Sequence, residues 1–110
     1  MYIIKKRMMV SGAHHLVLNY PSKCTNLHGH NWVIEVTLKS DHLNNNGMVM
    51  DFTHIKEIVN QLDHAYINDV LPKGMNPTAE NIACWLCENI PCCVRVSVQE
   101  TEGNVAVYER

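Results

Sequence analysis

The chain has 110 residues, which fits one domain covering residues 1–110 with a core of modest size. Apolar residues make up 46% of the chain and charged residues 18%, a composition typical of a globular protein rather than a disordered one. The net charge of −2 argues against nucleic-acid binding by general phosphate attraction, and no apolar run approaches the roughly 20 residues of a membrane span.

Two strands are predicted in the first part of the chain. Residues 2–18 are rich in Ile, Met and Val and predict a strand, and the polar residues 19–26 predict a loop. Residues 30–39 alternate between apolar and polar, with Trp32, Ile34, Val36 and Leu38 on one side. A period of two indicates a half-buried strand, and we expect the two strands to pair antiparallel.

A turn and a helix are predicted next. Residues 44–47 read Asn-Asn-Asn-Gly, and both residue types tolerate positive φ, so the chain should reverse there. Asp51 is the predicted N-cap of a helix. At helical spacing its buried face should hold Phe52, Ile55, Val59 and Leu62.

A second helix and two further strands complete the prediction. Asn76 and Pro77 form a break, Thr78 can cap the helix, and Pro91 ends it. The buried face of this helix should hold Ile82, Trp85, Leu86 and Ile90. Residues 94–99 and 105–108 predict strands joined by a turn. The order β-β-α-α-β-β indicates an α+β fold with an antiparallel sheet.

The histidines suggest a metal site. His28 and His30 are two residues apart, so in a strand both point to the same face. His14 or His15 lies on the neighbouring predicted strand, and periodicity does not distinguish these two. Three imidazoles with an open fourth position are typical of a catalytic zinc site. The His28–His30 pair alone is better explained by chance on a surface strand, but the neighbouring histidine and Cys24 favour the metal.

Two further groups are candidates for proton transfer. Cys24 lies in a polar, loop-like segment, which favours a reactive thiol over a small buried apolar residue. Asp63 precedes His64, and an aspartate that orients an imidazole makes a general acid–base group. A helix-terminal histidine that interacts with the helix dipole is the alternative interpretation of His64.

Other polar residues are less informative by themselves. Glu100 near a strand end could accept two N–H groups from a guanidine-like ring edge, but without further context a solvated charge is the favoured interpretation. His42 and His54 are predicted to lie on the surface.

Five cysteines occur, and four of them crowd together: Cys84, Cys87, Cys92 and Cys93. A zinc site at these thiols is possible by composition, but helical spacing favours core packing for Cys84 or Cys87. This crowding differs from the spread cysteines of a secreted disulfide scaffold, and residues 1–10 lack a signal-peptide pattern. We therefore expect a cytoplasmic protein.

Six short motifs, taken together, are specific. They occur over nearly the whole chain in the order seen in the 6-pyruvoyltetrahydropterin synthase family, at residues 11–16, 24–31, 47–52, 62–64, 76–81 and 99–101. The sequence therefore resembles this family. The resemblance implies the tunnelling fold, in which ββααββ subunits with two helices on one face of the sheet close a trimeric barrel. It further implies a homohexamer made of two stacked trimers, with active sites between subunits.

The resemblance also implies roles for individual residues. The family's zinc ligands correspond to His14, His28 and His30, which resolves the choice between His14 and His15. The catalytic cysteine corresponds to Cys24, and the catalytic Asp-His pair to Asp63 and His64. The pterin-anchoring glutamate corresponds to Glu100, with Thr78 near the ring edge.

The spacing of Cys24 bears on the reaction. Three residues separate Cys24 from His28, as in the 6-carboxytetrahydropterin synthase branch that serves queuosine and 7-deazapurine biosynthesis, whereas 6-pyruvoyl enzymes typically have a longer gap. The resemblance thus implies a Zn²⁺-dependent lyase that converts 7,8-dihydroneopterin triphosphate to 6-carboxytetrahydropterin, acetaldehyde and triphosphate. A 6-pyruvoyltetrahydropterin synthase and a non-catalytic zinc-binding module are the alternatives. A membrane or a nucleic acid is not an expected partner.

Overall fold

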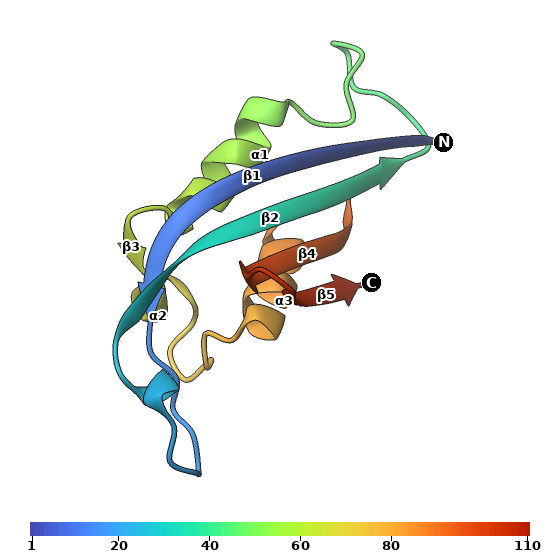
Figure 1. Cartoon of the computed structure of the whole chain (residues 1–110). Helices are drawn as coiled ribbons and strands as arrows, with labels where there is room; N and C mark the ends of the chain where they lie inside the picture. Colours follow the sequence, from blue (N-terminus) through green and yellow to red (C-terminus); the bar gives the residue numbers. More distant parts are fainter.

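Two long antiparallel strands, β1 (Tyr2–His14) and β2 (His28–Ser40), extend along the whole molecule (Figure 1). The structure is a computed structural model and describes all residues, 1–110. Strand β4 (Cys93–Thr101) pairs antiparallel with β2, and β5 (Asn104–Glu109) pairs antiparallel with β4. The strand order is β3-β1-β2-β4-β5. The predicted antiparallel arrangement of the four main strands is therefore confirmed.

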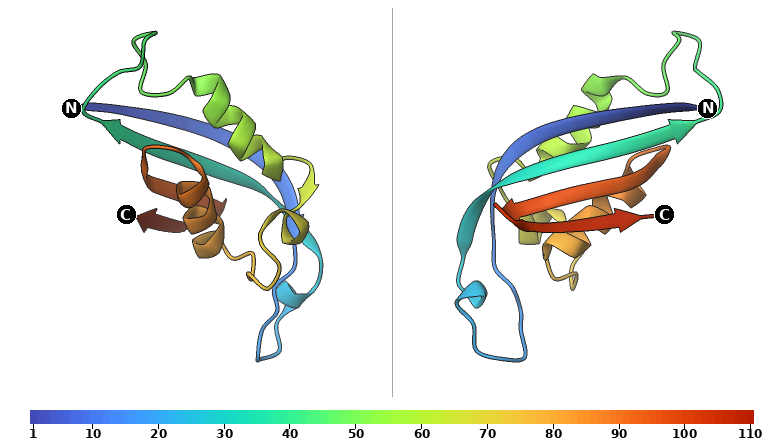
Figure 2. Two further views of the ribbon diagram at one scale, coloured as in Figure 1. Left: turned by 180° about the vertical axis from the view of Figure 1, so that it is seen from behind. Right: turned by 45° about the vertical axis from the view of Figure 1, so that its right-hand side comes forward.

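All helices lie on one face of this sheet (Figure 2). Helix α1 (Phe52–Val59) lies along β1, and α3 (Ala79–Asn89) packs against β4 and β5. Between them the short helix α2 (Ile67–Val70) lies near the end of β1. None of these helices has the length and apolar composition needed to cross a membrane. The predicted α+β fold, with helices on one face, is confirmed.

The core lies between the sheet and the helices, as the alternation in β2 predicts. The inward-facing side chains of β2 are fully buried: Trp32, Ile34, Val36 and Leu38. The helices oppose them with Ile55 and Val59 from α1, and Ile82 and Leu86 from α3. Each element therefore contributes the apolar face that its own sequence period defines.

The predicted caps and turn are present. Asp51 Oδ1 accepts a hydrogen bond from the Thr53 N–H at 2.8 Å at the start of α1. Thr78 Oγ1 accepts from the Asn81 N–H at 3.1 Å at the start of α3. Gly47 has a φ of +79° and donates its N–H to the Asn44 carbonyl at 2.9 Å, which closes the turn.

Several boundaries differ from the prediction. Strand β1 ends at His14 rather than at residue 18, and β2 begins at His28 rather than at residue 30. Helix α1 ends at Val59, and a 3₁₀ turn (Asn60–Leu62) continues it. The two-residue strand β3 (Ala65–Tyr66), which pairs parallel with β1, and helix α2 were not predicted. Both are too short to show a periodic pattern.

Two aromatic residues are less buried than predicted. Phe52 is 49% exposed because it stands at the open end of α1, where it lines a surface groove with Tyr2 and Ile3. Trp85 is half-buried. It stands one position before the buried Leu86, and therefore about 100° around the helix from it.

Gly12 allows β1 to approach the 3₁₀ turn closely. A Cβ at Gly12 would lie 2.8 Å from the Leu62 carbonyl oxygen and 3.0 Å from Ile67 Cδ1. Because a backbone oxygen cannot move aside as a flexible side chain can, we expect Gly12→Ala to lower the free energy of unfolding by about 1–3 kcal/mol. Urea unfolding would measure this loss.

Gly29→Ala is the matched control for that substitution. Gly29 lies on β2, where the only nearby atom to a new Cβ is the Gly12 carbonyl oxygen at 3.7 Å, an ordinary contact. Its unfolding midpoint should stay near the wild-type value. Equal losses in both variants would show that loss of glycine, rather than the clash at Leu62, is responsible.

Candidate metal centre and acid–base pair

Three histidines meet where β1 and β2 end and begin. His14 on β1 pairs directly with His28 on β2, and Gly12 pairs with His30. Because side chains alternate along a strand, His14, His28 and His30 share the face toward the helices. One nitrogen from each ring lies within 4.8 Å of the others. The structure thus brings together the three residues that the resemblance implies as metal ligands.

The outer nitrogens of two of these rings are held by backbone carbonyls. His14 Nδ1 lies 2.7 Å from the Pro77 carbonyl oxygen, and His28 Nδ1 lies 2.7 Å from the Asn26 carbonyl oxygen. A carbonyl oxygen only accepts hydrogen bonds, so each Nδ1 must carry the proton and donate it. In a neutral ring this leaves the lone pair on Nε2, the atom that faces the centre of the cluster.

The inner nitrogens form a set that can hold a cation. His14 Nε2 and His28 Nε2 lie 3.0 Å apart, and two lone pairs at that distance repel each other. His30 Nε2 is buried without any hydrogen-bond partner, because Glu100 Oε1, 3.4 Å away, does not have hydrogen-bonding geometry. A metal ion shared by the three nitrogens would satisfy all of them. The carbonyls of Pro77 and Asn26 would orient the ligating rings, as partners of metal-bound histidines commonly do.

The electrostatics of the cluster suit neutral ligands. Burial lowers the pKa of His14, and the hydrogen bond to Pro77 opposes this shift only partly. Burial likewise lowers the pKa of His30, against the raising effect of the Glu100 carboxylate. Below-normal pKa values keep both rings unprotonated at neutral pH, which leaves their lone pairs free to bind a metal.

Trp32 forms the floor of the cluster. Its ring makes edge contacts with His14 and His30, with ring centroids 4.9 Å and 5.1 Å apart. The indole N–H donates to the Gly12 carbonyl at 3.1 Å, so the ring is fixed in place. A rigid apolar wall beneath the histidines limits water on that side and holds their orientation.

Asp63 and His64 form a second polar group at the start of β3. Asp63 Oδ1 accepts from the Ser11 N–H at 2.8 Å, and Asp63 Oδ2 lies 3.0 Å from His64 Nδ1. Two hydrogen bonds lower the pKa of Asp63: the one from the Ser11 N–H has the larger effect, and the one from His64 has the smaller. Neighbouring residues can pair here because His64 has a φ of +52°, which turns its ring back toward Asp63. Such a backbone conformation is uncommon outside glycine and clusters at functional sites.

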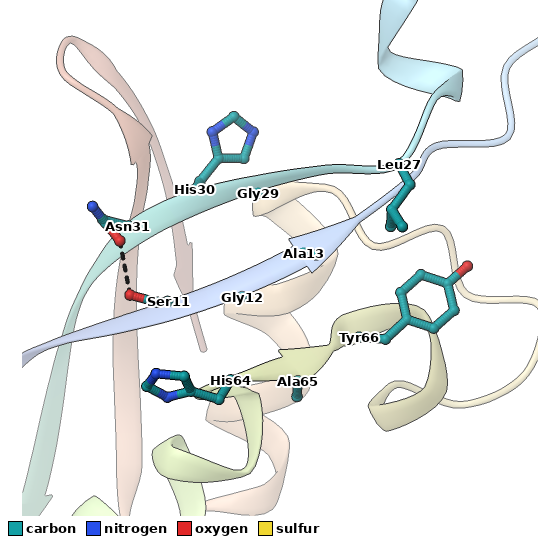
Figure 3. A pocket seen from close by; sticks show the side chains of 10 residues that line it. All are labelled: Ser11, Gly12, Ala13, Leu27, Gly29, His30, Asn31, His64, Ala65 and Tyr66. Atoms are coloured by element: carbon teal, nitrogen blue, oxygen red, sulfur yellow. Dashed lines mark hydrogen bonds between the residues drawn. The ribbon is translucent and has the colours of Figure 1, made fainter.

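The ring of His64 points away from the ring of His30. In Figure 3 its ring lies on the β3 side of β1, whereas the ring of His30 projects from β2 and away from that side. The His64 side chain is 84% exposed. It lines a surface cavity of about 600 Å³, a volume typical of ligand pockets, together with Ser11, His30 and Tyr66.

The remaining predicted site residues lie around the cluster. Cys24 is half-buried in the 3₁₀ turn Lys23–Thr25 between β1 and β2, and its thiol forms no hydrogen bond. Glu100 on β4 lies next to His30. The Thr78 hydroxyl caps α3 directly after Pro77, so it accepts one hydrogen bond and can still donate one.

The cysteine cluster and the surface histidines behave largely as predicted. Cys87 is fully buried in the core, and Cys84 is half-buried. Burial and the neighbouring Cys93 thiol raise the pKa of Cys87 to about 12, so this thiol is unreactive at neutral pH. His42 and His54 are exposed.

Sequence reasoning missed two contributions to this region. The Pro77 carbonyl lies 63 positions from His14 in sequence, and a backbone oxygen carries no residue-type signal. The Tyr66 hydroxyl and His15 Nδ1 form a hydrogen bond of 2.5 Å beside the cavity that His64 lines. Both depend on the segment between α1 and α3, of which only the break at Asn76 and Pro77 was predicted.

Comparison with known proteins is consistent along the whole chain. Residues 3–110 match the family model described as 6-pyruvoyl tetrahydropterin synthase. The chain is 37% identical to the 6-carboxy-5,6,7,8-tetrahydropterin synthase of Synechocystis, over 98% of this chain and 93% of that protein. It is 44% identical over 70 residues to a Pyrococcus horikoshii protein provisionally named as the same synthase. That match spans 60% of this chain and 44% of the Pyrococcus protein.

A solved structure has the same fold. The structure of Caenorhabditis elegans 6-pyruvoyl tetrahydropterin synthase superposes with a TM-score of 0.76 and 26% sequence identity. The superposition covers 99% of this chain and 95% of the nematode chain. The similarity therefore extends over both the sheet and the helices.

Proposed function

The chain belongs to the 6-pyruvoyl tetrahydropterin synthase family, and on this premise we propose that it is a zinc-dependent 6-carboxy-5,6,7,8-tetrahydropterin synthase. Its reaction converts 7,8-dihydroneopterin triphosphate and water to 6-carboxytetrahydropterin, acetaldehyde and triphosphate, a step of queuosine and 7-deazapurine biosynthesis. The observation that carries the proposal is the cluster of three Nε2 atoms, two of them fixed as lone-pair donors by backbone carbonyls.

His14, His28 and His30 are the proposed zinc ligands. Three neutral imidazoles and no fourth protein ligand match the open sites of catalytic zinc rather than the closed sites of structural zinc. Bound there, zinc supplies Lewis acidity toward the side-chain oxygens of the substrate. The Asn26 and Pro77 carbonyls keep the ligating nitrogens unprotonated.

The chain's own residues carry the proton transfers. We assign Cys24 as the base that removes a carbon-bound proton from the substrate side chain, because its thiol forms no hydrogen bond and stands in the turn between β1 and β2, whose ends carry the proposed ligands. His64 returns protons to the intermediate and assists cleavage of the carbon–carbon bond. Asp63 orients the His64 ring, which the 3.0 Å contact between Asp63 Oδ2 and His64 Nδ1 supports. Thr78 contacts the pterin ring edge.

The proposed site requires more than one copy of the chain. The His64 ring lies on the β3 side of β1, whereas the His30 ring projects from β2, so we propose that His64 serves the metal centre of a neighbouring subunit. The edge strand β5 also carries exposed Val105 and Val107, apolar side chains that an assembly would cover. We propose a homohexamer of two stacked trimers with active sites between subunits. Five free cysteines accord with a cytoplasmic location.

One assay tests the reaction. The zinc-loaded protein is incubated with 7,8-dihydroneopterin triphosphate, and acetaldehyde and the pterin product are measured together. Acetaldehyde with a 6-carboxy product in equal amounts supports the proposal. Absence of turnover by zinc-loaded protein would contradict it and favour a non-catalytic zinc-binding module.

A second candidate is 6-pyruvoyl tetrahydropterin synthase, which eliminates triphosphate without breaking the carbon–carbon bond. The superposition with the nematode enzyme of that name over 99% of this chain favours it. The same assay separates the two, because this activity gives a 6-pyruvoyl product and no acetaldehyde. The three-residue gap between Cys24 and His28 favours the 6-carboxy reaction.

Glu100 is the proposed anchor of the pterin ring. We expect Glu100→Gln to raise the KM about 10- to 100-fold while metal content stays at the wild-type value, because a charge-assisted hydrogen-bond pair is worth roughly 1.5–3 kcal/mol. Steady-state kinetics and metal analysis measure the two effects. Glu102→Gln, on the exposed turn of the same hairpin, is the control.

Loss of metal with an unchanged KM would contradict this role of Glu100. Glu100 Oε1 lies 3.4 Å from His30 Nε2, so that outcome would indicate that the carboxylate supports the metal ligand instead. The two roles are thus distinguished by which of the two measurements changes.

A further inference from the structure

Directly after β1, the backbone of residues 15–17 is bonded to side chains instead of a strand. Asn68 Oδ1 accepts from the His15 N–H at 3.0 Å, and Asn68 Nδ2 donates to the His15 carbonyl at 3.0 Å. Asn76 repeats the pattern at Val17, with distances of 3.0 Å and 3.1 Å. Each amide offers one acceptor and one donor, as a residue of a neighbouring strand would. We call Asn68 and Asn76 the asparagine clamp.

Leu16, which lies between His15 and Val17, forms its backbone hydrogen bond on the other side of the segment. The Leu16 N–H donates to the Cys24 carbonyl at 2.9 Å. The clamped segment therefore also holds the 3₁₀ turn Lys23–Thr25, on which Cys24 stands. Through this bond the clamp fixes the position of the Cys24 backbone relative to the end of β1.

Asn76 is itself held firmly at the start of α3. Its carbonyl accepts from the Thr78 N–H at 2.8 Å and from Asn81 Nδ2 at 2.8 Å. The next residue, Pro77, is buried, and its carbonyl accepts from His14 Nδ1 at 2.7 Å. The two residues Asn76 and Pro77 therefore fix both the orientation of the His14 ring and the position of the Val17 backbone.

We propose that Asn76, assisted by Asn68, is a positioning residue that aligns the metal ligand His14 with the Cys24 turn. The inference rests on the proposed function in one respect, namely that His14, His28 and His30 bind a metal. Two double hydrogen bonds replace the strand pairing that β1 loses after His14. They keep the Pro77 carbonyl in reach of His14 Nδ1, and they keep Cys24 at a fixed offset from the three ligands.

A merely structural role predicts a different result. Amides that only stabilise a loop would, when removed, lower the melting temperature and leave metal affinity unchanged once the protein is folded. A positioning role predicts weaker metal binding at temperatures where the variant is fully folded. Loss of a group that hydrogen-bonds a ligating histidine weakens metal binding by about 10–100-fold. The asparagine clamp does not bond to a ligating histidine itself but holds the segment whose carbonyl does.

The experiment compares wild type with Asn76→Ala, Asn76→Asp and Asn68→Ala, each shown to be folded by circular dichroism. Zn²⁺ affinity is measured by competition with a chelator, and Co²⁺ loading is followed by its visible absorption spectrum. We expect about 10-fold weaker Zn²⁺ binding by Asn76→Ala and an altered Co²⁺ spectrum. Asn76→Asp should also weaken binding, because it keeps the acceptor for the Val17 N–H but loses the donor to the Val17 carbonyl.

Asn89→Ala is the matched control. Asn89 Nδ2 also donates to a backbone carbonyl, that of Trp85 at 2.7 Å, but at the other end of α3 from Thr78. Its Zn²⁺ affinity should equal that of wild type. In the same samples, the alkylation rate of Cys24, followed by peptide mass spectrometry, should change in the clamp variants and stay constant in Asn89→Ala.

The outcomes separate this inference from the proposed function. Wild-type Zn²⁺ affinity and Cys24 reactivity in folded Asn76→Ala and Asn76→Asp would overturn the clamp while leaving the metal site intact. If Asn76→Ala does not fold, Asn76→Asp and Asn68→Ala give the same decision. Zn²⁺ binding by wild type that His28→Ala does not weaken would instead refute the metal site itself, and the clamp's role with it.

Discussion

Replacing Cys24 with alanine is expected to lower kcat roughly 10²–10⁴-fold while leaving one zinc per chain. The loss reflects removal of the proposed base, since a positioned proton acceptor contributes about that factor. Zinc should stay because the three ligand nitrogens come from histidines, and the Cys24 thiol bonds to none of them. Single-turnover kinetics with metal analysis of the same sample measures both quantities.

Cys92→Ser provides the control for the chemistry of thiols in general. Cys92 is exposed and lies just before β4, outside the cluster of ligands, so its replacement should leave kcat unchanged. Zinc loss in Cys24→Ala would contradict our assignment and make Cys24 a ligand or a structural support of the site. Unchanged kcat in that variant would move the base to another residue, with His64 the next candidate.

His28→Ala should abolish both metal binding and turnover. His28 supplies one of only three protein nitrogens, and its loss leaves His14 Nε2 without the neighbour that lies 3.0 Å away. Metal-ion catalysis contributes several kcal/mol, so we expect activity to fall by about 10³-fold or more. Zinc should raise the melting temperature of wild type, because a ligand that binds only the folded state stabilises it, and should leave that of the variant unchanged.

His54→Ala is the matched control for that substitution. His54 lies on the exposed side of α1 and contributes no atom to the cluster, so its metal content, melting shift and activity should equal those of wild type. Stoichiometric zinc in purified His28→Ala would refute the ligand assignment. Equal zinc loss in both histidine variants would indicate nonspecific surface binding.

The main elements were predictable because their signals are local. The alternation around Trp32 and Ile34 defines β2, and the capping side chains of Asp51 and Thr78 mark the starts of α1 and α3. Each signal arises from residues within a few positions of one another, where period and capping chemistry operate. Strand β3 and helix α2 were not predicted because each is too short to show a periodic pattern. Their conformation depends instead on contacts with β1 beside them.

The site was predictable in its residue types but not in its arrangement. Two histidines two apart on a strand must share a face, so the pairing of His28 with His30 follows from the sequence. The choice of His14 over His15 needed either the resemblance or the fold, since it depends on which face of β1 meets the helices. The position of His64 across β1, and the carbonyls of Asn26 and Pro77, depend on tertiary contacts that no local pattern encodes.

The connection between β1 and β2, residues 15–27, is too long to fix the alignment of the two strands as a two-residue turn would. A slip of two residues would keep every side chain on its own face and would place Val10 opposite Ile34 instead of Trp32, still an apolar pair. The same slip would set His14 opposite His30 and carry it past His28. His28 would then stand diagonally across from His14, so three imidazoles would still be neighbours, but β1 would have moved by about 7 Å along β2. A shift of that size would break the hydrogen bond from His14 Nδ1 to the Pro77 carbonyl just before α3, so this bond selects the native register.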